Sequence, residues 1–169
     1  EKPEEIRAIK HVVSNGKKIA CTGVGKLCLF DVEKQTWVHP QHPEVPSVRG
    51  LVWWNDDIVL VMPNKKMHEF SLKIMSVDDN KITCKKTIRL TGCPTSMRAN
   101  ETSLVIALTS LVIVIKNDEN YTQTKYETQG TISDIAKTTR KLFTLGRGRH
   151  LLCEGKEILS NVSSFFIDN

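Results

Sequence analysis

A glycine-rich hexapeptide is the segment that comes nearest to a phosphate-binding loop. It runs Thr22-Gly23-Val24-Gly25-Lys26-Leu27. A complete phosphate loop would need a glycine at position 20 and a serine or threonine at position 27, where this chain has Ala20 and Leu27. Without that hydroxyl, no side chain is placed to bind the magnesium ion of a nucleotide. We therefore expect no cofactor here and interpret the glycines as a turn between two strands.

Histidines are the second group of residues that could do chemistry. His39 and His42 lie close together, but Glu44 is the one carboxylate beside them, so a metal ligand set is incomplete. The remaining histidines occur singly, at His11, His68 and His150. None has a serine, cysteine or carboxylate placed to make a catalytic set. We expect no metal site and no catalytic residues, and hence no enzyme.

The five cysteines form an odd set without short paired spacing, which indicates neither a disulfide framework nor a zinc knuckle. They are Cys21, Cys28, Cys84, Cys93 and Cys153, and buried reduced thiols fit them best. The first residues lack a secretory signal, so a cytoplasmic or nuclear address is expected. Glycosylation patterns at Asn100, Asn120 and Asn161 stand against that address, and their use is left open.

Composition and charge leave the broad class open. The 169 residues are 40% hydrophobic and 25% charged, with no apolar run long enough to cross a bilayer. A chain of this length can bury one core, or it can be stacked repeats that belong to a larger ring. Its net charge of +5 would suit an acidic partner.

A period of about 40 residues orders the apolar residues. Four apolar triplets begin 39, 46 and 38 residues apart, at Ile19, Ile58, Leu104 and Leu142. An apolar residue precedes three of these triplets by seven positions, namely Leu51, Met97 and Ile135. In the first unit Ile6 and Ile9 take this place, with a looser step of ten. Such a period is the mark of a repeat architecture.

Each triplet is followed by a second apolar run and then by a more polar segment. The second runs are Leu27–Phe30, Met67–Phe70, Leu111–Ile115 and Leu151–Cys153. The closing segments are Thr36–Val38, Ile82–Leu90, Tyr121–Thr128 and Ile158–Phe166. Turn residues such as Asn15-Gly16 separate them. The pattern predicts an all-β chain of four units, each with four antiparallel strands, over approximately 5–44, 45–91, 92–129 and 130–169.

Two segments also fit a helical period. Residues 3–16 have a helix-like start and stop, and residues 131–145 can be interpreted in the same way. The equivalent segments around Trp53 and Met97 are poor helices, so the repeat argument favours strands throughout.

The units resemble the blades of WD40-like β-propellers. The segment Leu27 to Thr36 looks like the end of that family's third strand, with Phe30-Asp31 where a Trp-Asp dipeptide usually stands. Ile132 to Ala136 followed by Arg140 to Phe143 looks like its inner strand, turn and second strand. No Gly-His dipeptide opens a unit, and the other three third strands lack a Trp-Asp equivalent. The resemblance implies a degenerate propeller that binds proteins.

The adjacent residues Trp53 and Trp54 are expected on an inner strand, where neighbouring side chains point to opposite faces. We expect one ring between two blades and the other to be less buried. Trp53 is then either a core residue or a recognition anchor for a partner.

The resemblance also predicts on which face each charged loop lies, because the loops of a propeller alternate between its two faces. One face would carry Lys26, Lys65, Lys66, Arg147 and Arg149 against Glu44, and the opposite face would be mixed and acidic-leaning. These basic residues are candidates for binding an acidic segment of a partner protein, and ordinary solvated turn charge is the alternative.

The leading hypothesis is a non-catalytic protein-interaction scaffold within a larger complex. The alternative is a module that contacts nucleic acid or an anionic membrane, although it lacks aromatic platforms for single strands. Four units are fewer than WD40-like rings usually contain. We therefore expect further blades from a partner, a second copy or other parts of the parent protein. Without them, apolar residues would be exposed at Ile6, Ile9, Phe143, Phe165 and Phe166.

Overall fold

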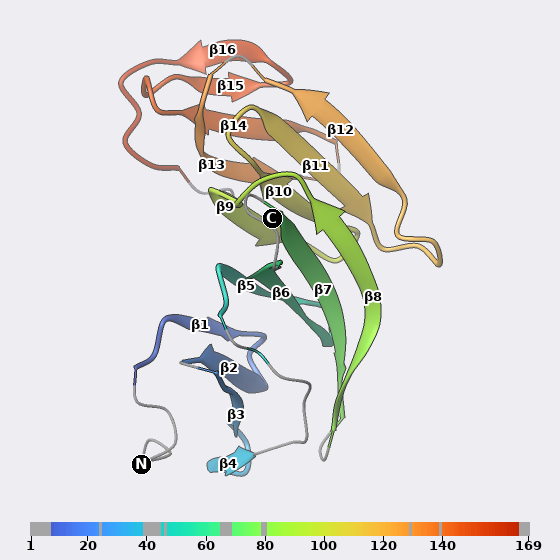
Figure 1. The fold of residues 1–169 in the computed structure, drawn as a ribbon. Coiled ribbons are helices and arrows are strands. Elements are labelled where there is room, and N and C mark those ends of the chain that lie inside the picture. Colours follow the sequence, from blue (N-terminus) through green and yellow to red (C-terminus); the bar gives the residue numbers. More distant parts are fainter. Residues whose placement is uncertain are drawn as a thin grey trace. The chain divides into compact units, whose positions relative to one another are not determined.

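The computed structural model describes residues 8–23, 25–38, 45, 47–64, 69–78, 81–128, 130–138 and 140–165. These residues form sixteen strands, and none of them is helical (Figure 1). The strands make four antiparallel sheets of four strands each. This confirms the prediction of an all-β chain built from four-stranded antiparallel units. The chain divides into two compact units, residues 1–91 and 92–169, which are described separately.

The first unit contains two sheets whose strands follow one another in chain order. Sheet 1 consists of β1 (His11–Ser14), β2 (Lys18–Thr22), β3 (Leu27–Asp31) and β4 (Thr36–Val38). Sheet 2 consists of β5 (Gly50–Trp54), β6 (Asp57–Pro63), β7 (Phe70–Val77) and β8 (Ile82–Leu90).

The second unit repeats this meander. Sheet 3 consists of β9 (Ser96–Ala99), β10 (Ser103–Ala107), β11 (Leu111–Lys116) and β12 (Gln123–Glu127). Sheet 4 consists of β13 (Ile132–Lys137), β14 (Leu142–Gly146), β15 (Leu151–Cys153) and β16 (Lys156–Leu159). Each of the four apolar triplets lies in the second strand of its sheet. The segment 131–145, which also fits a helical period, forms β13 and β14.

The first strand of sheet 1 differs from its prediction. Ile9 was expected on that strand, but β1 begins at His11, and Ile6 lies outside the described residues. Val12 pairs with Cys21 across the sheet, as Leu51 pairs with Leu60 in sheet 2. The step of seven residues to the following triplet therefore holds in sheet 1 too, with Val12 in place of Ile9. Hydrophobicity alone misplaced the strand because Ile9 and Val12 are both apolar and three residues apart.

Two outer strands were also predicted at the wrong residues. The third strand of sheet 2 was expected at Met67–Phe70, but β7 runs from Phe70 to Val77, and residues 67 and 68 are outside the described part. In β7, polar residues such as Ser71 and Lys73 alternate with apolar ones, so the strand has no continuous apolar run. The last strand was expected from Ile158, but β16 begins at Lys156, directly after the tight turn at Glu154-Gly155.

The core of the first unit is formed by one face of each sheet. Val13, Ala20, Leu29 and Val38 are register partners across sheet 1, so they share a face. That face packs on the side chains of sheet 2, among them Trp53, Ile58 and Leu60. The indole Nε1 of Trp53 also donates a hydrogen bond to the carbonyl oxygen of Val13, at 3.1 Å. Sheets 1 and 2 are thus held by apolar packing and by a polar link between their first strands.

Both tryptophans are buried, Trp53 to 8% exposure and Trp54 to 2%. The prediction that one of the two rings would be less buried is therefore wrong. Adjacent strand residues do point to opposite faces, but both faces of sheet 2 are covered, since Val59 and Ile74 on the Trp54 side are fully buried as well.

The second unit is held in the same way. Val105, Val112 and Val114 of sheet 3 pack on Ile132, Ile135 and Leu142 of sheet 4. Between the first strands, Asp134 accepts a hydrogen bond from the Ser96 hydroxyl at 2.8 Å and pairs with Arg98 at 3.3 Å. The amide Nδ2 of Asn100 donates to the Lys137 carbonyl at 2.9 Å. Polar links between first strands therefore accompany the apolar core in both units.

Side chains close the hairpin turns. The Asp31 carboxylate accepts a hydrogen bond from the Lys34 backbone N–H at 2.9 Å and forms an ion pair with the Lys34 ammonium at 3.5 Å. These contacts lower the pKa of Asp31 below its ordinary value. Between β2 and β3, the Gly23 N–H donates to the Lys26 carbonyl, and Gly25 has a φ of 76°, which favours glycine. The glycine-rich hexapeptide is a strand-to-strand turn, as predicted.

Replacing Trp53 with phenylalanine tests the link between sheets 1 and 2. The variant loses the indole donor and leaves the Val13 carbonyl without that bond, so we expect the free energy of unfolding to fall by about 1–3 kcal/mol. Chemical denaturation measures it. Trp37→Phe is the matched control, because Trp37 is half-buried on the other face of sheet 1 and donates no such bond to any residue that the structure describes. An equal loss in both variants would contradict the assigned role of the indole bond.

Replacing Asp31 with asparagine tests the β3–β4 turn through its pH dependence. Because the folded pKa lies below the unfolded value, the charged carboxylate stabilises the fold above about pH 4, and this stabilisation disappears as pH falls through the folded pKa. We expect Asp31→Asn to be less stable than the parent chain near neutral pH, with the gap closing in acid. Urea denaturation across this range measures it, and a gap independent of pH would refute the account.

Candidate protein-interaction surfaces

The basic residues singled out by the sequence occupy corresponding loops of their sheets. Lys26 lies between β2 and β3, and Arg147 and Arg149 lie between β14 and β15, so each loop joins the second strand to the third. Lys65 and Lys66 fall in the corresponding loop between β6 and β7 but lie outside the described residues. The structure brings Arg147 and Arg149 together in one loop. Lys26 belongs to the other unit.

The backbone of the β14–β15 loop is tightly held. The Arg147 N–H donates to the Thr131 carbonyl at 2.9 Å, and the Arg149 N–H donates to the Gly146 carbonyl at 3.0 Å. Val162 in turn donates to the Arg149 carbonyl at 2.9 Å. Arg149 has a φ of 63°, a conformation that a non-glycine residue adopts when its surroundings enforce it. The loop is a fixed support for its two side chains.

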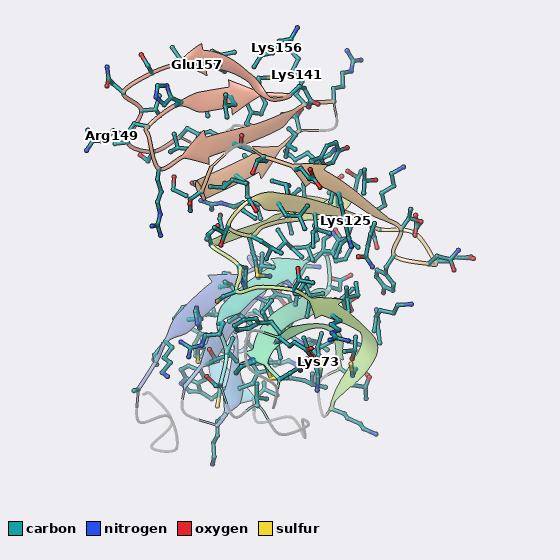
Figure 2. The ribbon with its side chains drawn as sticks, turned by 45° about the horizontal axis from the view of Figure 1, so that its top comes forward. Lys73, Lys125, Lys141, Arg149, Lys156 and Glu157 are labelled. Atoms are coloured by element: carbon teal, nitrogen blue, oxygen red, sulfur yellow. The ribbon has the colours of Figure 1, made fainter. Side chains whose placement is uncertain are left out.

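Both arginine side chains of this loop are free for a partner. They are exposed, and neither forms an ion pair with any residue that the structure describes. Figure 2 shows Arg149 at one end of sheet 4, with Lys141 and Lys156 at the opposite end. Lys26, by contrast, is half-buried beside its turn and has further contacts. Among the three described candidates, Arg147 and Arg149 are thus more accessible than Lys26.

Loops at the opposite end of the sheets carry charges of both signs. Some of their carboxylates are structural. Asp118 accepts hydrogen bonds from the backbone N–H groups of Thr122, at 2.9 Å, and of Asn120, at 3.1 Å, and these bonds lower its pKa. Arg140 and Lys141 are exposed in the β13–β14 loop. Arg140 and Lys141 therefore serve as a comparison for Arg147 and Arg149, because they are two exposed basic residues of the same sheet that the basic-loop hypothesis does not involve.

The second candidate surface is the face of sheet 1 that points away from sheet 2, which we call the first outer face. Strand register places apolar side chains across all four strands on it, namely Val12, Ile19, Cys21, Cys28, Phe30 and Trp37. Phe30 and Trp37 meet edge to face, with ring centroids 5.3 Å apart. Val12 is 58% exposed, Ile19, Phe30 and Trp37 are half-buried, and Cys21 and Cys28 are buried. Since the opposite face of sheet 1 is also apolar, both faces of this sheet are built for burial.

Sheet 4 has a corresponding second outer face, on the side away from sheet 3. Register places Ala136, Phe143 and Cys153 together, and Leu145, Leu151 and Leu159 beside them. Leu145 and Leu151 are buried, and Leu159 is 57% exposed. Among the residues expected on apolar flanks, Ile9 is exposed, Phe143 and Phe165 are half-buried, and Phe166 is outside the described part. The sequence analysis did not name Val12 and Leu159 among the residues on the apolar flanks. The alternation of side chains along their strands would have placed both on the outer faces.

Trp53 does not contribute to either outer face. Its ring lies in the core between sheets 1 and 2, and its N–H is bound to Val13. The core interpretation of this residue therefore accounts for its packing and for its polar atom.

The cysteines are only partly as expected. All five are free, and Cys21 and Cys28 are buried, where burial raises the pKa of Cys21. Cys84 and Cys93 are exposed, so the expectation of buried thiols is wrong for them. Cys84 lies on the outer strand β8, within a run of four exposed residues from Cys84 to Thr87, and Cys93 follows that strand in a loop.

The candidate metal ligands and the glycosylation motifs can also be located in the structure. No group of three or more His, Cys, Asp or Glu residues that could hold a metal ion occurs within the described ranges, and His39, His42, Glu44 and His68 lie outside them. Asn100 is half-buried, and its side chain closes a turn and donates to Lys137. Asn120 and Asn161 are exposed. In the part of the chain described, no helix has the length and hydrophobicity of a membrane span.

Comparisons with solved structures identify the fold. The chain is similar to the WD40 domain of Neurospora crassa Pan2, with a TM-score of 0.67 at 13% identity over 89% of this chain and 50% of that one. It is similar to a chain of the mitotic checkpoint complex, with a TM-score of 0.65 at 14% identity over 93% of this chain and 53% of that one. PorZ of the type-IX secretion system of Porphyromonas gingivalis gives 0.63 at 13% identity over 95% of this chain and 29% of PorZ.

These likenesses concern the fold, since no family model and no curated protein matches the sequence. The chain spans about half or less of the length of the solved structures it matches. The four meandering sheets, the links between first strands within each unit and these structural neighbours together show that the chain is folded as WD40-like β-propeller blades.

Proposed function

We propose that this protein is a non-catalytic interaction scaffold that works as part of a larger assembly. The observation that carries the proposal is the first outer face, where apolar side chains span sheet 1 on the side away from sheet 2. A sheet with two apolar faces is stable when a further layer covers each of them. Exposed apolar side chains on such a face mark association sites, and here they are Val12 with the half-buried Phe30 and Trp37.

The occupant of an outer face is another β-sheet of the same kind. Sheets 1 and 2, and sheets 3 and 4, already show how such faces pack in this chain. The structural neighbours are about twice as long or longer, so a propeller of their size has room for further blades. These blades would come from a partner protein, from a second copy or from other parts of the parent protein.

Within that assembly, the basic loops are proposed to hold an acidic segment of a partner. Arg147 and Arg149 carry this part of the proposal, because both are exposed on a backbone fixed by hydrogen bonds. A fixed support reduces the entropy lost when two guanidinium groups bind carboxylates. Lys26, Lys65 and Lys66 occupy the corresponding loops and extend the same basic character to the other sheets.

Charge reversal at Arg147 and Arg149 tests the basic loop. We expect Arg147→Glu with Arg149→Glu to weaken binding of a polyglutamate peptide at low salt by about tenfold or more, since two charge-assisted contacts are lost. The control variant combines Arg140→Glu with Lys141→Glu, which reverses the same number of charges at the other end of sheet 4. Isothermal titration calorimetry measures both. Equal losses in the two variants would mean that overall charge, rather than this loop, attracts the peptide.

The same titrations separate the proposal from a nucleic-acid contact module. A DNA duplex bound through many phosphates loses affinity steeply with salt, because each contact releases counterions. We expect the chain to bind the duplex more weakly than the peptide near physiological salt. A tighter, steeply salt-dependent affinity for the duplex would favour the nucleic-acid function instead.

A further inference from the structure

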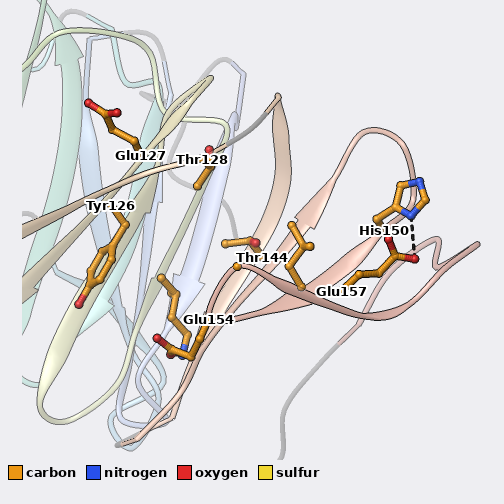
Figure 3. Close-up of a pocket in the computed structure, with 10 residues that line it drawn as sticks. Tyr126, Glu127, Thr128, Thr144, His150, Glu154 and Glu157 are labelled. Atoms are coloured by element: carbon orange, nitrogen blue, oxygen red, sulfur yellow. Dashed lines mark hydrogen bonds and ion pairs between the residues drawn. The ribbon is translucent and has the colours of Figure 1, made fainter.

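A pocket of about 510 Å³ lies in the second unit, between β12 and the strands of sheet 4 (Figure 3). Its lining includes Tyr126 and Thr128 from β12 and the residue after it, Thr144 and Leu152 from β14 and β15, and Glu154 and Glu157 from the β15–β16 hairpin. This volume is in the range of ordinary ligand sites. The pocket lining contains neither of the two loop arginines, and His150 is the residue that the β14–β15 loop contributes to it.

Strand register explains which side chains face this space. Tyr126 pairs with Val112, whose side chain packs toward sheet 4, so Tyr126 points the same way, and so does Thr128 two residues further on. On the other side, Thr144, Leu152 and Glu157 are register partners across three strands and share the face that meets sheet 3. The outer parts of the two sheets therefore present polar residues to each other, beyond their apolar core.

One hydroxyl group in the pocket is buried without a hydrogen-bond partner among the described residues. It belongs to Thr128, whose oxygen is shielded from solvent. Thr144 also lines the pocket and is only 6% exposed. Leaving a buried hydroxyl without a partner costs free energy, so native proteins rarely tolerate it without a reason. Figure 3 shows Thr144 among the lining residues, with Glu154 on one side and His150 with Glu157 on the other.

The charged groups around these hydroxyls are mainly acidic. Glu127, Glu154 and Glu157 all line the pocket, with His150 as the basic group. Glu154 accepts a hydrogen bond from the Leu142 N–H, and Glu157 lies 3.1 Å from the Nδ1 of His150. Because carboxylates outnumber the imidazole, the pocket repels anions and favours a cation that can donate hydrogen bonds.

The apolar part of the lining suits the stem of a long basic side chain. Leu142 and Leu152 form an apolar wall, and the Tyr126 ring offers a face to a cation. The strands that border the pocket, β12 and β16, are edge strands of their sheets and are exposed along their length. An extended segment of another protein can therefore lie along these edges and reach inward with one side chain.

We propose that this pocket binds a lysine or arginine side chain from an extended segment of a partner protein. The ammonium or guanidinium group donates to the Thr144 and Thr128 hydroxyls and is neutralised by Glu157 and Glu154. Its aliphatic stem packs on Leu142 and Leu152. This surface has the opposite charge preference to the basic loop, so its test is independent of the function proposed above.

The experiment titrates the intact chain, with labelled threonine and leucine methyl groups, against a capped Gly-Gly-Arg-Gly-Gly peptide by NMR. We expect the methyl resonances of Thr144, Leu142 and Leu152 to shift. Thr144→Val keeps the shape of the side chain and removes the hydroxyl, and Glu157→Gln removes one charge. Each substitution is expected to weaken binding about tenfold. Glu119→Gln is the control, because Glu119 is an exposed carboxylate in a loop of the same unit, and it should bind like the parent chain.

Further titrations identify the ligand. A Gly-Gly-Glu-Gly-Gly peptide is expected to leave these resonances unchanged, and free spermine is expected to shift them less than the arginine peptide. The proposal is overturned if Thr144→Val and Glu157→Gln both bind like the parent chain, or if Glu119→Gln loses as much. It is also overturned if the glutamate peptide or spermine matches the arginine peptide. The amide spectrum of each variant shows whether the fold is intact.

Discussion

The structure depends on one constraint, which is that each apolar face of each sheet has to be covered by another layer. In the first unit, Ala20 and Leu29 of sheet 1 are buried because Ile58 and Leu60 of sheet 2 lie against them. In the second unit, Val105 and Val114 are buried by Ile135 and Leu142. A single four-stranded meander with apolar side chains on both faces cannot satisfy this constraint alone. Repetition along the chain is therefore the physical reason for the fold.

Polar contacts determine how the sheets meet. The Trp53 indole and the Asp134 carboxylate both bond to the first strand of the preceding sheet. Farther out, between β12 and the last strands of sheet 4, hydroxyls and carboxylates replace the apolar residues and leave a pocket. The same pair of sheets thus combines a packed interior with an outer cleft that offers hydrogen bonds. A scaffold uses such a division, because the interior supplies rigidity and the periphery supplies recognition.

Much of the fold was predictable from the period of the apolar triplets, because second strands are buried on both faces and contain continuous apolar residues. The outer strands were less predictable. β7 alternates Ser71 and Lys73 with apolar residues, and β16 begins with charged Lys156, so neither has a strong apolar run. The pocket could not be inferred from the sequence at all, since Thr128 and Thr144 become neighbours only when two sheets pack. The sequence predicted that Arg147 and Arg149 share one loop, because Gly146 and Gly148 indicate a turn there.

The state of the isolated chain in dilute solution tests the central claim most directly, namely that the outer faces of sheets 1 and 4 require further layers. Sedimentation velocity over a range of concentrations, together with binding of a fluorescent dye specific for apolar surface, measures it. The account predicts either association beyond the monomer or strong dye binding, with a decrease when Val12, at the first outer face, is replaced by lysine. A monomer at every concentration that binds no dye would contradict it and would indicate a small closed β domain.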